Sequence, residues 1–107
     1  MDDRELFGRR IRAIREAANL SRETAAEKAR ITANYLGEIE RGEKWPAFDM
    51  LGQLASALNV APASFFQFQD EEVDPAILLA KINQLLEARD VKQLQQALRL
   101  LKALFVA

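Results

Sequence analysis

The 107-residue chain carries 15 basic and 16 acidic side chains, and half of its residues are hydrophobic. Because it contains neither cysteine nor histidine, disulfides, zinc sites built on these residues, thiol nucleophiles and histidine general bases are excluded. No run approaches the roughly 18 apolar residues of a membrane span, and the acidic N-terminus does not resemble a secretory signal. We therefore expect a small cytoplasmic protein without metal, cofactor or membrane association.

Hydrophobic spacing in the first half of the chain predicts successive helices. One apolar stripe with 4-3-4 spacing is formed by Phe7, Ile11, Ile14 and Ala18. Asn19 suits the left-handed position that ends this helix. Ser21 and Thr32 are good N-caps for two short helices, the second of which stops at Gly42.

Two further helices are predicted before residue 69. Pro46 suits the first turn of a fourth helix, where the missing N–H costs nothing. The apolar face of this fourth helix consists of Met50 or Leu51, with Leu54, Ala55 and Leu58. Pro62 opens a short fifth helix, whose Phe65 and Phe66 close the core. Residues 1–69 are thus predicted to form one five-helix domain.

Residues 70–107 are predicted to form a separate two-helix hairpin. The acidic stretch around 70–74 is the linker, and Asp74 caps a helix that runs to about Arg89. Asp90 caps a second helix, which runs to about Phe105. This last helix carries an apolar stripe with 3-4-3-4 spacing, formed by Val91, Leu94, Leu98, Leu101 and Phe105.

The hairpin contains more apolar side chains than one contact between two helices can cover. It either packs back on the first domain or pairs with a second copy to form a four-helix bundle, and we favour the second copy. The predicted dimerisation residues are Leu94, Leu98, Leu101 and Phe105.

Residues 20–42 read LSRETAAEKARITANYLGEIERG. Two short helices, each with a Ser or Thr N-cap, are joined here by a tight turn, and this is the pattern of a helix-turn-helix. The chain resembles the lambda-repressor-like family of transcriptional regulators, of the Cro/cI or xenobiotic-response-element type. The resemblance covers about residues 5–68 and includes RIRAIRE, the IERG signature and ALNV.

The resemblance implies that the second helix of the motif lies in the major groove of double-stranded DNA. The implied base-contacting residues are Arg22, Thr32, Ala33, Asn34, Gly37 and Glu38, and the implied phosphate-contacting residues are Tyr35, Arg41 and Lys44. Asn34 can pair with adenine N6 and N7, Ala33 can contact a thymine methyl group, and Glu38 can accept from cytosine N4. Arg15 and Glu40 match a buried ion pair that is common in the family.

Three residues depart from the family pattern. Ala25 stands where a leucine is usual, so a bulkier neighbour such as Phe48 or Trp45 is expected to fill the space. Arg30 occupies a turn position where many relatives carry glycine, so either the turn avoids a positive φ or Arg30 is strained. Glu38 places a carboxylate where relatives often carry a basic or amide group.

The sequence therefore predicts a sequence-specific DNA-binding regulator, not an enzyme, and most simply a repressor that binds a palindromic operator as a homodimer. The alternative is a protein-interaction module, such as an antitoxin or anti-repressor, whose C-terminal hairpin binds a partner protein.

Overall fold

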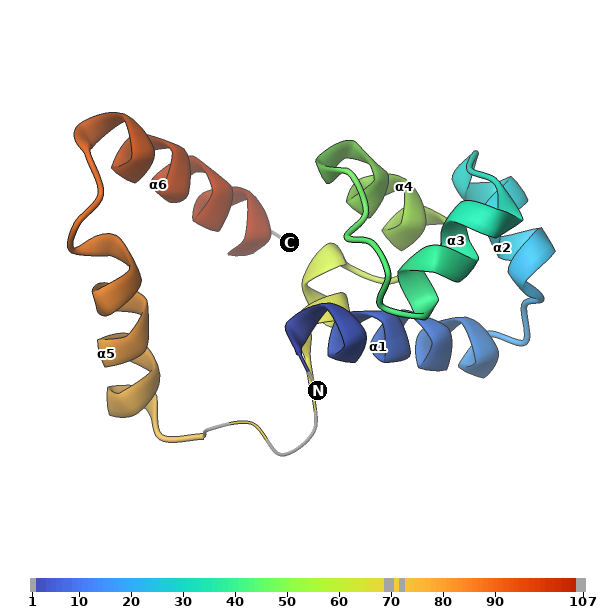
Figure 1. Ribbon diagram of the computed structural model, residues 1–107, viewed down its shortest axis with the longest axis horizontal. Coiled ribbons are helices and arrows are strands. Elements are labelled where there is room, and N and C mark those ends of the chain that lie inside the picture. Colours follow the sequence, from blue (N-terminus) through green and yellow to red (C-terminus); the bar gives the residue numbers. More distant parts are fainter. Residues whose placement is uncertain (1, 69–70, 72, 106–107) are drawn as a thin grey trace. The chain divides into compact units, whose positions relative to one another are not determined.

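The computed structural model describes residues 2–68, 71 and 73–105, and all regular elements in these residues are helical. The elements are α1 (Asp3–Ala17), α2 (Arg22–Ala29), α3 (Ala33–Glu40), α4 (Phe48–Leu58), the 3-10 helix η1 (Pro62–Phe66), α5 (Pro75–Leu86) and α6 (Val91–Phe105). The predicted all-α class, with five helices followed by two, is confirmed (Figure 1). The chain divides into unit 1, Met1–Phe68, and unit 2, Gln69–Ala107, and each is described by itself.

Side-chain caps begin the helices of the helix-turn-helix. Ser21 accepts a hydrogen bond from the Thr24 N–H at 3.0 Å, and Thr32 accepts one from the Tyr35 N–H at 3.0 Å. Both predicted N-caps are confirmed, as is the left-handed Asn19, whose φ is 58°. These bonds satisfy amide groups that have no partner within a helix.

The core of unit 1 lies between α1, α2, α3, α4 and η1. Its buried hydrophobic residues are Phe7, Ile11, Ala25, Ala26, Ala29, Leu36, Ile39, Leu54, Ala55, Leu58 and Phe65. Small side chains on α2 let its backbone approach α4, against which it packs. In Figure 1, α1 runs along one side of the unit beneath α3. Ala18 does not extend the apolar stripe of α1, because the helix ends at Ala17 and Ala18 is exposed.

Two details of unit 1 differ from the prediction. Helix α4 begins at Phe48, with Ala47 as its N-cap residue, so Pro46 precedes the helix instead of lying in its first turn. Pro46 is buried, and the first bond of the helix runs from the Met50 N–H to the Ala47 oxygen at 2.9 Å. Phe65 is buried as expected, whereas Phe66 is about half exposed.

The helices of unit 2 begin at the expected caps. Asp74 accepts from the Ala76 N–H at 2.9 Å, and Asp90 and Gln93 bond to each other's backbone N–H at 2.8 and 3.2 Å, which is a capping box. Helix α5 ends at Leu86, three residues before the predicted end. Arg89 Nε donates to the Leu85 oxygen at 2.9 Å and so satisfies one of the last carbonyls of the helix.

Neither helix of unit 2 contains a buried residue. In the apolar stripe of α6, Leu94, Leu98 and Phe105 are 41%, 55% and 78% exposed, and only Leu101 is half-buried. The stripe is therefore not covered by α5. None of the helices in the described part of the chain combines the length and hydropathy that crossing a bilayer requires.

Candidate nucleic-acid interface

The first turn of α3 presents its polar side chains to solvent. Thr32 and Asn34 are exposed, whereas Ala33 is half-buried and packs partly against the core. The hydroxyl oxygen of Thr32 is used in capping, but its proton remains available to an acceptor. The exposed face of this turn thus offers a hydroxyl, an amide and a methyl group.

Asn34, Glu38 and Lys44 form a polar network on the same face. Asn34 Nδ2 donates to Glu38 Oε1 at 3.3 Å, and Lys44 Nζ lies 3.0 Å from Glu38 Oε2. The Glu38 side chain is 20% exposed and that of Lys44 is 56% exposed. Each carboxylate oxygen therefore has a partner, and the negative charge of Glu38 is compensated by Lys44.

Glu40, at the end of α3, forms ion pairs with two arginines. Arg15 Nε and Nη2 donate to the two oxygens of Glu40 at 2.7 and 3.0 Å, which makes a bidentate pair between α1 and α3. The Glu40 side chain is 1% exposed. The hydrogen bond to Glu40 raises the pKa of Arg15 above its ordinary value. Arg22 Nη2 lies 3.4 Å from the same carboxylate, so Arg22 is tied to the buried pair.

Arg22 and Arg41 converge over Gly37. A Cβ atom placed on Gly37 would lie 2.9 Å from Arg41 Nη1 and 3.6 Å from Arg22 Cδ. Gly37 is buried, so the arginines would have to move before a base could reach it. The Nε atom of Arg22 is buried and has no hydrogen-bond acceptor among the described residues. Arg41 forms an ion pair with Glu43.

Tyr35 connects α3 to the start of α4. Its hydroxyl oxygen accepts a hydrogen bond from the Ala47 N–H at 3.0 Å. This hydrogen bond links the start of α4 to α3. A hydroxyl that accepts a hydrogen bond can still donate its own proton to a further acceptor.

Sequence reasoning missed some of these connections. It assigned Arg22 to the bases without predicting that the guanidinium group of this residue lies 3.4 Å from the Glu40 carboxylate. It treated Asn34, Glu38 and Lys44 as separate contacts, whereas the structure joins them. The i, i+4 spacing of Asn34 and Glu38 was the available signal for the first bond, but nothing in the sequence places Lys44 beside them.

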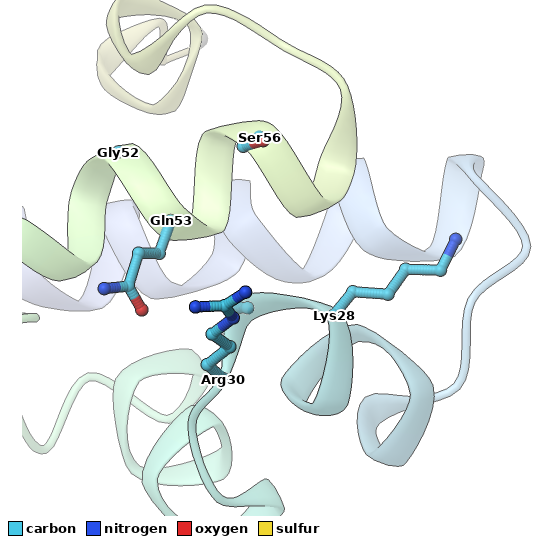
Figure 2. Close-up of a pocket in the computed structure, with 6 residues that line it drawn as sticks. Lys28, Arg30, Gly52, Gln53 and Ser56 are labelled. Carbon is cyan, nitrogen blue, oxygen red and sulfur yellow. The ribbon is translucent and has the colours of Figure 1, made fainter.

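A second surface feature of unit 1 is a cavity of about 370 Å³ between the end of α2 and the middle of α4 (Figure 2). It is lined by Lys28, Ala29, Arg30, Gly52, Gln53 and Ser56. This lining shares no residue with the candidate interface. Within the described residues, no group of three acidic side chains lies close enough together to hold a metal ion.

Comparison with known proteins places the helix-turn-helix in a family. The profile of the HTH_3 family, described as Helix-turn-helix, matches residues 11–65, just over half of the chain. The chain is 39% identical over 57 residues to the uncharacterized HTH-type transcriptional regulator YazB of Bacillus subtilis, an alignment that covers 53% of this chain and 83% of YazB.

Two other known proteins are similar to part of the chain. The immunity repressor of Bacillus phage phi105 is 40% identical over 53 residues, which are 50% of this chain and 37% of the repressor. The restriction-modification controller protein C.AhdI of Aeromonas hydrophila has 36% sequence identity and a TM-score of 0.59, with 60% of this chain and 97% of that protein covered. The chain belongs to the HTH_3 helix-turn-helix family, a family of DNA-binding transcription regulators.

Proposed function

We propose that this regulator binds one DNA sequence specifically and represses transcription there as a homodimer on a palindromic operator. The observation that carries the proposal is the exposed first turn of α3, where Asn34 is bonded to Glu38 and Glu38 to Lys44. Arg22 and Arg41 converge over Gly37 of the same helix. The mechanism is equilibrium binding and involves no chemistry. The site of action is the cytoplasm.

Base reading is assigned to the first turn of α3. Asn34 presents an amide that matches adenine N6 and N7 in the major groove, and the Ala33 methyl group suits a thymine methyl. Thr32 adds a hydroxyl donor. These three residues supply the contacts that distinguish one sequence from another.

Phosphate binding is assigned to the residues around α3. The guanidinium groups of Arg22 and Arg41 converge over Gly37, and such a pair suits the oxygens of a phosphate. The hydroxyl of Tyr35 and the ammonium of Lys44 complete the set. Because phosphates are the same in every sequence, these contacts supply affinity and orientation without specificity.

Dimerisation is assigned to unit 2. Leu94, Leu98 and Phe105 of α6 are exposed, and neither helix of the unit buries a residue. A second copy would cover these side chains, and its helix-turn-helix would bind a second half-site about one helical turn away. Repression follows when the dimer covers a promoter.

The proposal is tested by fluorescence anisotropy on a duplex that the protein selects from a random library, with a scrambled duplex as competitor. We expect the selected duplex to resist the competitor, and Asn34→Ala to lower affinity for it by about 1–3 kcal/mol. Arg41→Ala should weaken binding to both duplexes and lower the salt slope by about one. Arg99→Ala, which removes an exposed arginine from α6, is the matched control and should leave the salt slope unchanged. Equal affinity of the wild-type protein for both duplexes would refute sequence specificity.

The exposed apolar side chains of α5 and α6 also support a second candidate, in which unit 2 binds a different protein and the chain acts as an antitoxin or anti-repressor. Co-purification of a second protein at fixed stoichiometry would favour this candidate. A homodimer by sedimentation, without a second species, would exclude it.

A further inference from the structure

The network of Asn34, Glu38 and Lys44 contains an acidic residue on the face that reads bases. Glu38 lies one helical turn after Asn34, and both of its carboxylate oxygens are engaged, at 3.3 Å by Asn34 Nδ2 and at 3.0 Å by Lys44 Nζ. A cytosine amino group would have to share or displace one of these partners. The arrangement therefore favours a role for Glu38 within the protein over direct contact with a base.

An ionised carboxylate accepts hydrogen bonds and cannot donate them. The Asn34 amide must therefore turn its NH2 group towards Glu38, because the opposite orientation would bring two acceptor oxygens together. One N–H is then directed to Glu38, while the second N–H and Oδ1 stay free. Adenine offers the complementary pair in the major groove, an acceptor at N7 and a donor at N6.

We propose that Glu38 is a positioning residue that fixes the Asn34 amide in the orientation that reads adenine, while Lys44 neutralises its carboxylate. This inference rests on the proposed function, since it requires α3 to read bases. Glu38 then influences the preference for adenine at the base pair that Asn34 contacts, and it does not itself contact a cytosine.

The same arrangement determines how much of the positive charge of Lys44 is available to the phosphates of DNA. An unpaired carboxylate at Glu38 would repel the phosphates of any DNA, and the ion pair with Lys44 removes most of that repulsion. As a consequence, Lys44 contributes less than a full positive charge to binding the phosphate backbone of DNA. A substitution that removes the charge of Glu38 should therefore leave the ammonium group of Lys44 free to bind a phosphate.

The test compares the base preferences of Asn34→Ala, Glu38→Ala and Glu38→Gln, each measured by selection from a random duplex library. We expect Glu38→Ala to lose preference at the same base pair as Asn34→Ala, by about 5- to 100-fold. Glu38→Gln keeps an oxygen that can accept from Asn34, so it should retain most of the preference, while its salt slope rises by about one because Lys44 is released.

A measurement without DNA accompanies the selection. In the full chain, the two side-chain amide protons of Asn34 should differ in chemical shift by more than those of a free asparagine. Glu38→Ala should reduce this difference to the free value, while Glu38→Gln should preserve most of the excess. Circular dichroism establishes that each variant is folded.

Loss of a cytosine preference at another position in Glu38→Ala, with the Asn34 position unchanged, would overturn the inference. An unaltered base preference in Glu38→Ala would also overturn it. If the wild-type protein selects no sequence, the proposed function fails, and the amide shifts still decide whether Glu38 positions Asn34.

Discussion

Gly8 of α1 lies directly against the Ile39 carbonyl of α3, so closely that a Cβ atom on Gly8 would be 2.3 Å from that oxygen. Real Cβ atoms do not approach a carbonyl oxygen to this distance. The contact sets the spacing between α1 and α3, because the obstructing atom belongs to the backbone and cannot rotate away.

Gly8→Ala should accordingly destabilise unit 1 by about 1–3 kcal/mol, the usual cost of overpacking a core. The free energy of unfolding is measured by urea denaturation. Gly52→Ala is the matched control, because a Cβ at that position of α4 meets nothing within 4 Å. It should be neutral or stabilise by up to about 1 kcal/mol. Equal unfolding midpoints for the two variants would show that α1 and α3 can separate without cost.

Glu40→Ala should destabilise the protein by about 3–5 kcal/mol, because Arg15 would lose its bidentate partner in a buried site. Glu16→Ala is the comparison, because Glu16 pairs with Arg12 at the surface, where the two side chains are 56% and 60% exposed. This variant should lower the free energy of unfolding by no more than about 0.5 kcal/mol. Chemical denaturation of both variants measures the contrast. A wild-type midpoint for Glu40→Ala would contradict a structural role for the pair.

Arg30 adopts a left-handed conformation with a φ of 62°, and this settles the alternative that the sequence left open at this turn. Arg30→Gly should stabilise the protein relative to Arg30→Ala by about 1 kcal/mol, because both variants lose the side chain and only glycine relieves the strain. Thermal unfolding of the pair provides the measurement. A more stable alanine variant would show that the turn is not strained.

Leu98→Asp should convert the proposed dimer to a monomer, because it places a charge in the middle of the exposed stripe of α6. Gln95→Asp introduces the same charge on the same helix at an exposed polar position and should leave the dimer intact. Sedimentation at micromolar concentration measures both. If Leu98→Asp and the wild-type protein sediment alike, α6 does not carry the interface.

Local chemistry explains why much of the fold could be predicted. Ser21 and Thr32 fix helix starts through bonds to amides three residues away, and Asn19 ends α1 in a left-handed conformation. Such signals lie within a few residues of their effect. The start of α4 was misplaced by two residues: Ala47 is the N-cap residue of this helix, and its N–H is bonded to Tyr35, 12 residues away in the sequence.

The sequence indicated which residues belong to the candidate site, but it did not indicate which of them contact each other through the tertiary structure. The family resemblance identified Asn34, Glu38 and Lys44 individually. The bond between Asn34 and Glu38 lies within α3, but the ion pair of Lys44 with Glu38 depends on how the loop after α3 returns to that helix. The same limit applies to Arg22, whose partner Glu40 lies 18 residues away in the sequence. Contacts of this kind require the tertiary structure.

The hydrogen bond between Tyr35 and Ala47 also bears on how the protein would respond to the shape of DNA. It fixes the separation between the first turn of α3 and the backbone amides at the start of α4. If the first turn of α3 contacts bases as proposed, and the amides at the start of α4 bind a phosphate, both contacts can be made together only where the groove has a matching width. Base pairs that no side chain touches would therefore influence affinity through the cost of deforming the duplex to that width.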